Sequence, residues 1–315
     1  MSVCHWCNSN EIEVLCGAVI APWILDDSGS EEVKQSGLSE YCHCCNCGLH
    51  FFSKRFTDGQ LKRMYSHYRD KEYQKNRQRY EPWYTEKFNN AIGNDPETIE
   101  LRRKNLFFLV SKAVIEEKIS APKVVVDWGG DRGQFIPDFP NLTKKLVYEV
   151  SNSVPIDGVD RTESVEEVKL ARPDLVLLCH VLEHDHSARE TINQLSQLML
   201  EESVLYIEIP EDRSPVVPRT KRNSALLSFL LRHRIAFIVF DAYSLLTMRV
   251  LGRKFPFQFL KQSEHVNFYC RESIMKVTES YGFEVVAETR YSTNPKAKKA
   301  SANALGLLLR KTSSD

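Results

Sequence analysis

The 315-residue sequence is defined first by what it lacks. Its 42 basic residues are balanced by 42 acidic ones, so no net charge draws the whole protein to nucleic acid or anionic lipid. It has no uninterrupted run of about 18 apolar residues, so we expect no membrane span. Its first ten residues are polar and do not resemble a secretory signal peptide. These absences predict a cytoplasmic protein with neither nucleic acid nor membrane as a partner.

Cysteine is scarce outside one end of the chain, where seven of the nine cysteines fall in the first 47 positions. An odd total gathered in this way does not suggest a disulfide framework and favours a metal site in a reducing compartment. Two Cys-x-x-Cys pairs can surround one Zn²⁺ ion tetrahedrally. The thiolates that we favour as ligands are Cys4, Cys7, Cys44 and Cys47.

The later pair has a second possible register, Cys42 with Cys45. We favour Cys47 as the last ligand because Gly48 follows it directly, and glycine eases the turn of such a knuckle. A zinc ribbon over residues 1–57 is too small to fold on apolar burial alone, so the structural ion would provide much of its stability. Free structural thiols are the alternative.

A helical connector is predicted over residues 58–120, with apolar and aromatic residues at helical spacing. Tyr65 and Tyr68 lie on this face. They either bury their rings and expose their hydroxyls, as in any amphipathic helix, or belong to a cap that supplies a phenol to a substrate. Both interpretations stay open.

A strand followed by a glycine-rich turn is the stretch that organises the rest of the chain. Residues 124–135 read V-V-V-D-W-G-G-D-R-G-Q-F, and three β-branched residues in a row are typical of a buried parallel strand. The spacing D-x-G-x-x-x-G is neither the dinucleotide fingerprint nor a phosphate loop. An ordinary strand and turn is the alternative to a nucleotide site. The candidate binding residues are Asp127, Trp128, Gly129, Gly130 and Gly133.

Two further strands end in polar residues at what would be the same edge of a parallel sheet. Glu149 follows the apolar run 146–148 and could accept hydrogen bonds from both hydroxyls of a ribose. A strand-end glutamate without a role is the alternative. Cys179 and His180 follow the buried run 175–178. A metal cluster of His180 with the two later histidines of the segment lacks a supporting carboxylate pattern.

These motifs resemble class I S-adenosylmethionine-dependent methyltransferases. The glycine turn is similar to their D-x-G-x-G-x-G, with Asp131 at the place of the middle glycine. Residues 174–184, D-L-V-L-L-C-H-V-L-E-H, are similar to their fourth-strand motif D-L-V-x-x-x-x-V-L-E-H. The resemblance implies a doubly wound, seven-stranded α/β sheet whose last strand is antiparallel. It also implies that Glu149 binds the adenosyl ribose and that Cys179 and His180 face the methionine end, with Glu183 on the following helix.

The segment 264–269 resembles the E-H-x-x-x-F box of a methyltransferase subgroup that also carries an N-terminal zinc ribbon. In sugar C-methyltransferases of that subgroup, the histidine and its neighbouring glutamate are linked to substrate deprotonation. The resemblance therefore implies His265 as general base, with Glu264 beside it in the sequence, and a sugar or nucleotide-linked sugar as substrate. A core histidine that holds a loop is the alternative.

The sequence thus predicts a zinc ribbon (1–57), a helical connector (58–120) and a methyltransferase domain (121–315). An insertion at about 213–262 is expected to form two amphipathic helices that cover the substrate site or bind a partner; a solvated basic face and an interfacial membrane helix are alternatives. The predicted activity is C- or O-methylation of a saccharide. A non-catalytic binding protein and a zinc-ribbon nucleic-acid methyltransferase are the competing hypotheses.

Overall fold

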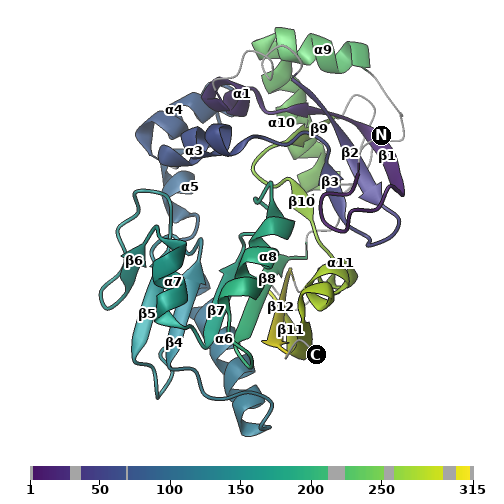
Figure 1. Cartoon of the computed structure of the whole chain (residues 1–315). Helices are drawn as coiled ribbons and strands as arrows, with labels where there is room; N and C mark the ends of the chain where they lie inside the picture. The colour runs from purple at the N-terminus through teal and green to yellow at the C-terminus, as the bar shows by residue number, and fades with distance from the viewer. Residues whose placement is uncertain are drawn as a thin grey trace. The chain divides into compact units, whose positions relative to one another are not determined.

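The computed structural model describes residues 3–28, 37–68, 70–211, 224–251, 259–293 and 303–312 (Figure 1). The chain divides into two compact units, each with its own sheet. The first unit comprises residues 1–4, 8–92 and 213–268, and the second comprises residues 5–7, 93–212 and 269–315.

The second unit is built on a seven-stranded sheet with the strand order β11-β12-β8-β7-β4-β5-β6. Its strands are β4 (Val124–Trp128), β5 (Lys144–Tyr148), β6 (Asp160–Thr162), β7 (Leu175–Cys179), β8 (Val204–Pro210), β11 (Phe283–Tyr291) and β12 (Ala304–Lys311). The pairs from β6 through β5, β4 and β7 to β8 are parallel, whereas β12 runs antiparallel to both β8 and β11. The predicted doubly wound sheet with an antiparallel last strand is confirmed.

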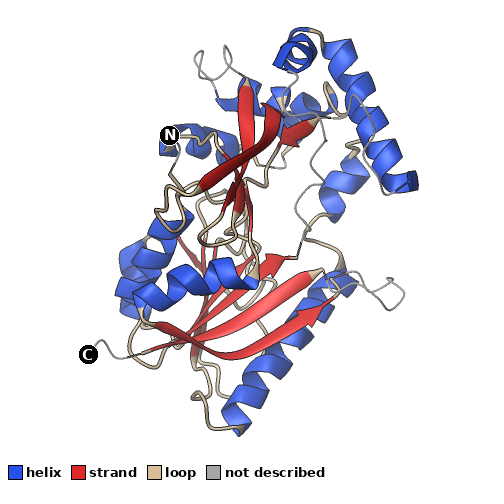
Figure 2. Cartoon of the chain, turned by 90° about the vertical axis from the view of Figure 1, so that its right-hand side faces the viewer, coloured by secondary structure: helices blue, strands red, loops and turns tan. Residues whose placement is uncertain are grey.

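Helices cover both faces of this sheet (Figure 2). They are α6 (Pro96–Ile115), α7 (Val165–Ala171), α8 (Ala188–Leu198) and α11 (Arg271–Thr278), followed by the short 3₁₀ helix η1 (Glu279–Tyr281). Asp95 caps α6 by accepting a hydrogen bond from the Thr98 N–H at 3.0 Å, and Pro96 occupies the first turn. The central strands β4 and β7 are almost wholly buried, so the core of this unit lies between sheet and helices.

The first unit holds a five-stranded sheet with the order β10-β3-β2-β1-β9. Its strands are β1 (Ile12–Ile20), β2 (Leu38–Cys44), β3 (His50–Phe52), β9 (Leu260–Gln262) and β10 (Asn267–Phe268). β1, β2 and β3 form an antiparallel meander, β9 pairs in parallel with β1, and β10 pairs antiparallel with β3. The segment that carries the Glu-His motif therefore joins the sheet of the cysteine-bearing strands.

Six helices are described in the first unit: α1 (Pro22–Ser28), α3 (Asp58–Ser66), α4 (Lys71–Gln78), α5 (Glu86–Ala91), α9 (Ser224–Arg232) and α10 (Arg234–Leu251). The continuous helical pattern expected after residue 57 is broken into three short helices. Thr57, Asp70 and Thr85 each begin one of them by accepting a hydrogen bond from a backbone N–H three residues later. Each internal cap interrupts the helix that the side-chain spacing predicted. The two helices expected in the insertion are α9 and α10.

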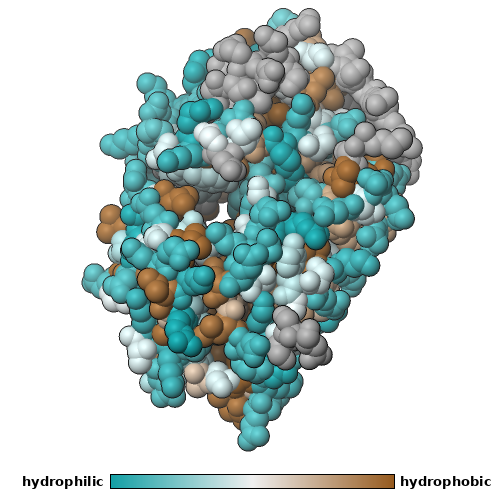
Figure 3. Space-filling view, viewed as in Figure 1, coloured by the Kyte–Doolittle hydropathy of each residue, from teal (hydrophilic) through white to brown (hydrophobic). Residues whose placement is uncertain are grey.

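Within the described ranges, no helix is both long and apolar enough to cross a membrane. On the face drawn in Figure 3, hydrophilic residues predominate and hydrophobic residues occur in small scattered groups.

Candidate functional site

The glycine-rich turn leaves β4 at the carboxyl edge of the seven-stranded sheet. Gly129 and Gly133 adopt φ angles of +68° and +70°, and Asp131 adopts the same left-handed conformation at +54°. Glycine enters this region without steric cost, whereas an L-residue with a Cβ is strained there. Asp131 thus takes the backbone conformation that the middle glycine of the motif would take.

The glycines of the turn also leave room that a side chain would fill. A Cβ on Gly130 would lie 2.1 Å from Cγ of Asp127, and one on Gly133 would lie 2.8 Å from the Val159 side chain. Because real Cβ contacts are not this short, the turn can pack against Asp127 and Val159 only with glycine at these positions. Gly130 thus lies directly on the Asp127 side chain.

Asp127 is a buried acid without a hydrogen-bonding partner in the described part of the chain. It is fully buried, and neither carboxylate oxygen accepts a hydrogen bond. Burial raises the pKa of this carboxyl to about 7, against the opposing effect of the Arg102 guanidinium. A buried acceptor of this kind normally has a partner, so the site provides for a ligand with N–H or O–H donors.

Glu149 follows β5 and lies against the glycine turn. One of its carboxylate oxygens accepts the Asp131 N–H at 3.0 Å, and the other accepts the Ser151 N–H at 2.8 Å. The Gly129 N–H in turn donates to the carbonyl of Tyr148 at 2.8 Å, and the Trp128 ring stacks on the Tyr148 ring at 4.1 Å. The two backbone bonds fix the carboxylate while leaving lone pairs for further donors.

His180 follows β7 at the same edge and lies between two carboxylates. Its Nδ1 is 2.8 Å from Glu183 Oε1, and its Nε2 is 3.0 Å from Glu208 Oε1. Burial lowers the pKa of His180, but the two acids more than offset this and raise it to about 9. Burial also raises the pKa of the neighbouring Cys179 thiol. His180 is therefore a cation at neutral pH, and Cys179 a thiol.

Glu183 was expected on a helix after β7, but it lies in a turn that precedes α8. Successive turn hydrogen bonds, from the His184 N–H to the Val181 carbonyl and from the Asp185 N–H to the Leu182 carbonyl, hold the chain there. The three histidines at 180, 184 and 186 do not form a metal-binding group among the described residues. The alternative of a histidine metal cluster is thus not supported.

Glu208 on β8 is the centre of an ion network that sequence reasoning missed. It accepts hydrogen bonds from Tyr206, at 2.9 Å, and from Tyr291, and Arg102 of α6 lies 2.5 Å away. Burial opposes ionisation of Glu208, but Arg102 and His180 hold its pKa well below the usual range. No local pattern could link Arg102 with Glu208, because more than a hundred residues separate them.

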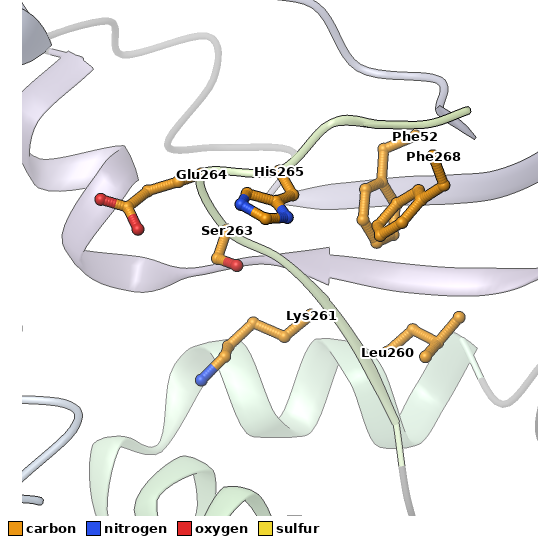
Figure 4. Close-up of a pocket in the computed structure, with 7 residues that line it drawn as sticks. All are labelled: Phe52, Leu260, Lys261, Ser263, Glu264, His265 and Phe268. Carbon is orange, nitrogen blue, oxygen red and sulfur yellow. The ribbon is translucent and has the colours of Figure 1, made fainter. Parts of the chain in front are cut away.

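A separate cavity of about 330 Å³ lies within the first unit (Figure 4). It is lined by Phe52, Leu260, Lys261, Ser263, Glu264, His265 and Phe268. The rings of Phe52 and Phe268 meet edge to face, with centroids 5.9 Å apart. The cavity therefore combines one aromatic wall with charged and hydroxyl groups, and both members of the Glu-His motif line it.

Glu264 is held by two side chains of α4. The Tyr73 hydroxyl donates to Glu264 Oε1 at 2.5 Å, and Arg77 donates to Glu264 Oε2 at 3.2 Å and to the Tyr73 oxygen at 2.7 Å. Burial and the Glu264 carboxylate raise the pKa of Tyr73, so its phenol stays protonated. Tyr65 and Tyr68 contact each other edge to face, and Tyr68 contacts Tyr73 in the same way. Catalytic roles for Tyr65 and Tyr68 stay predictions, whereas Tyr73 is the phenol on Glu264.

A second buried carboxylate continues this network. Glu81 accepts hydrogen bonds from Arg77 at 2.8 Å, from Lys261 at 2.7 Å and from the Trp23 indole at 3.1 Å. Burial alone would raise the pKa of Glu81, but Lys261 and Arg77 lower it below the usual value. Lys261, which lines the cavity, is thereby paired with a buried carboxylate.

The predicted zinc ligands Cys4, Cys7, Cys44 and Cys47 have sulfurs that all lie within 4.8 Å of one another. The Asn8 N–H closes the first knuckle on the Cys4 carbonyl, and the Gly48 N–H closes the second on the Cys44 carbonyl. Gly48 has a φ of +77°, as the turn after the last thiol requires. The donor set suits a structural Zn²⁺ ion.

The remaining register, Cys42 with Cys45, is less suited to a metal. Burial, followed by the nearby Glu40, raises the pKa of the Cys42 thiol to about 12, which disfavours the thiolate that zinc needs. Cys45 is exposed, whereas Cys42 is buried. Zinc itself stays a prediction.

Among solved structures, the chain is similar to the N-methyltransferase NodS from Bradyrhizobium japonicum, with 13% identity over 70% of this chain and 99% of that one, at a TM-score of 0.38. It is also similar to the 1,6-didemethyltoxoflavin-N1-methyltransferase of Burkholderia thailandensis, with 15% identity over 71% and 82% of the two chains, at a TM-score of 0.40. A third similar structure is an S-adenosylmethionine-dependent methyltransferase from Clostridium acetobutylicum, with 11% identity over 74% of this chain and 99% of that one, at a TM-score of 0.40. No curated protein matches the sequence.

The family model described as a methyltransferase domain matches residues 65–288, which is more than half of the chain. This match agrees with the strand order of the seven-stranded sheet and with the motifs at its carboxyl edge. The chain therefore belongs to the methyltransferase-domain family and is an S-adenosylmethionine-dependent methyltransferase.

Proposed function

We propose that this enzyme methylates a hydroxyl or a carbon atom of a saccharide, carried on a nucleotide, with His265 as general base. The observation that carries the proposal is the cavity of the first unit, which His265 and Glu264 both line and at which Tyr73 and Arg77 fix the Glu264 carboxylate. A histidine that lines a small-molecule cavity is the commonest kind of general base. The predicted cytoplasmic location and saccharide partner belong to the same proposal.

The lining of the cavity supports a saccharide as acceptor. A sugar ring presents C–H groups on its faces and hydroxyls around its edge. Phe52 and Phe268 offer an apolar wall to such a face, and Lys261, Ser263 and Glu264 offer donors and acceptors to the hydroxyls. A volume of about 330 Å³ lies at the lower end of the range for small-molecule pockets.

The edge of the seven-stranded sheet supports the cofactor assignment. When bound, S-adenosylmethionine supplies an electrophilic methyl group. Glu149 would accept hydrogen bonds from the ribose hydroxyls, and the unpartnered Asp127 would accept them from an ammonium or a bound water. Cys179 and His180, which follow at the end of β7, would lie at the methionine end.

In this proposal, a residue of the first unit removes the proton of the acceptor. An imidazole titrates near neutral pH, so neutral His265 can take a proton as the acceptor atom becomes nucleophilic. Arg77 and the Tyr73 phenol both donate to Glu264 and thereby hold its carboxylate in place at the cavity.

A methyl-transfer screen across nucleotide sugars tests the proposal, with His265→Asn as the decisive variant. We expect its kcat to fall at least about 100-fold, the ordinary contribution of a general base. His233→Asn is the control, because His233 is an exposed histidine of the same unit, and we expect its turnover to stay within twofold. Turnover of His265→Asn equal to that of the unmodified enzyme would exclude His265 as the base.

A further inference from the structure

A second group of metal-ligating side chains lies on the sheet of the first unit. Glu13 of β1, His43 of β2 and Cys45, which directly follows β2, have ligand atoms within 4.8 Å of one another. Glu13 and His43 are direct partners across the antiparallel pair. Such partners have Cβ atoms about 4.5–5.5 Å apart, so the register of the sheet itself brings the carboxylate to the imidazole.

This group is separate from the four thiols of the predicted zinc ribbon. His43 and Cys44 are neighbours on one strand, so their side chains point to opposite faces of the sheet. Cys44 is buried, as are Cys4 and Cys47, whereas His43 is half-buried and both Glu13 and Cys45 are exposed. The two groups share no residue and have different access to solvent.

The three side chains are available for a ligand. The His43 ring stacks on that of His50, its partner on β3, with centroids 4.4 Å apart and planes 27° apart, which orients the imidazole. Within the part of the chain that the structure describes, the side chains of Glu13 and Cys45 make neither a hydrogen bond nor an ion pair. Binding an ion here would therefore break no interaction of these two side chains.

We propose that Glu13, His43 and Cys45 bind a divalent transition-metal ion of the Zn²⁺ or Co²⁺ type, with the fourth coordination position open to water. One sulfur, one nitrogen and one carboxylate oxygen match the preference of these borderline ions. Metal–ligand distances of about 2.0–2.3 Å in a tetrahedron place ligand atoms about 3.3–3.8 Å apart. The three atoms need to approach by only about 1 Å, within reach of side-chain rotation.

Titration of the zinc-loaded full-length protein with Co²⁺ tests the site. Metal content per chain is measured after gel filtration, and visible absorption reports the Co²⁺ geometry and a thiolate charge-transfer band. We expect one tightly held ion and one additional Co²⁺ with a single thiolate ligand. Cys45→Ser should abolish the charge-transfer band and weaken the second event at least about 100-fold, and Glu13→Gln should weaken it about tenfold or more.

Glu11→Gln is the matched control, because it removes the same charge at an exposed position two residues away, directly before β1. It should leave the second event within twofold of the unmodified protein. Three results would overturn the proposal. The protein could bind a single ion in total; Cys45→Ser could release the tightly held ion, which would make Cys45 a ligand of the ribbon; or Glu11→Gln could weaken binding as much as Glu13→Gln, which would indicate surface charge alone.

Discussion

Replacing Glu208 by glutamine should destabilise the seven-stranded unit more than any other single loss of charge in it. The side chain is 1% exposed, and it lies 2.5 Å from the buried Arg102 and 3.0 Å from the half-buried His180. Glutamine keeps the shape and the bonds from Tyr206 and Tyr291, but it leaves Arg102 without its counter-charge and His180 with Glu183 alone. Breaking a buried pair by removing one partner costs about 3–5 kcal/mol, and we expect the free energy of unfolding to fall by that amount.

The assay is urea denaturation at pH 7, followed by tryptophan fluorescence and far-UV circular dichroism. Glu211→Gln is the control, since Glu211 lies at the end of the same strand and pairs with Arg290 at 2.8 Å while both side chains are partly exposed. An exposed pair contributes about 0–1 kcal/mol, so this control should shift the midpoint little. A fall of less than about 1 kcal/mol in the free energy of unfolding of Glu208→Gln would refute the claim that Glu208 balances a buried cation.

Three further predictions concern other parts of the molecule. Burial raises the pKa of Asp127 from 3.8 to about 7, so the stability that its carboxyl contributes is fully present below pH 3.8 and is lost as the pH rises to 7. In urea melts between pH 5 and 7, the free energy of unfolding of Asp127→Asn should therefore rise relative to that of the unmodified protein by about 1.4 kcal/mol per pH unit. Parallel pH profiles of the two proteins would contradict this. Gly130→Ala should lower the free energy of unfolding by about 1–3 kcal/mol, because the new Cβ would clash with Asp127. Gly59→Ala is the control and should not lower it, because a Cβ on Gly59 meets nothing within 4 Å. Equal melting temperatures of the two variants would refute the contact. Cys44→Ser should lose zinc, as measured by atomic emission, and should have a lower melting temperature, whereas Cys42→Ser should keep the metal. Loss of zinc in Cys42→Ser but not in Cys44→Ser would instead support Cys42 and Cys45 as the ligands.

The strands of the seven-stranded sheet were predictable because each carries a continuous local signal. The β-branched run before Asp127 and the apolar run before Cys179 are bounded by turn residues, and both form strands over the expected positions. Gly282 ends the helix η1 with a φ of +75°, as glycine commonly does after a helix. Where hydrophobic runs and punctuating glycines agree, the local pattern decides the element without knowledge of tertiary contacts.

The partners of the candidate site residues could not be predicted in the same way. Tyr73 and Glu264 are 191 positions apart, and neither their spacing nor their surroundings in the sequence indicates that they meet. The same holds for the parallel pairing of β9 with β1, which brings the Glu-His segment to the N-terminal strands. Such contacts depend on the closure of long loops, which leaves no periodic trace in the sequence. Helix caps such as Asp70, by contrast, were visible in the sequence but were outweighed by the helical spacing around them.

The carboxyl edge of the seven-stranded sheet is the proposed cofactor site, and the proposed activity depends on it. The most direct measurement is a calorimetric titration of S-adenosylmethionine into the full-length protein and into Glu149→Gln, with the exposed Glu166→Gln as control. We predict saturable binding that weakens about tenfold or more in Glu149→Gln, because a charged acceptor of the ribose hydroxyls is lost, and that is unchanged in the control. Absence of binding at millimolar cofactor, or equal affinity in Glu149→Gln and the unmodified protein, would contradict the account.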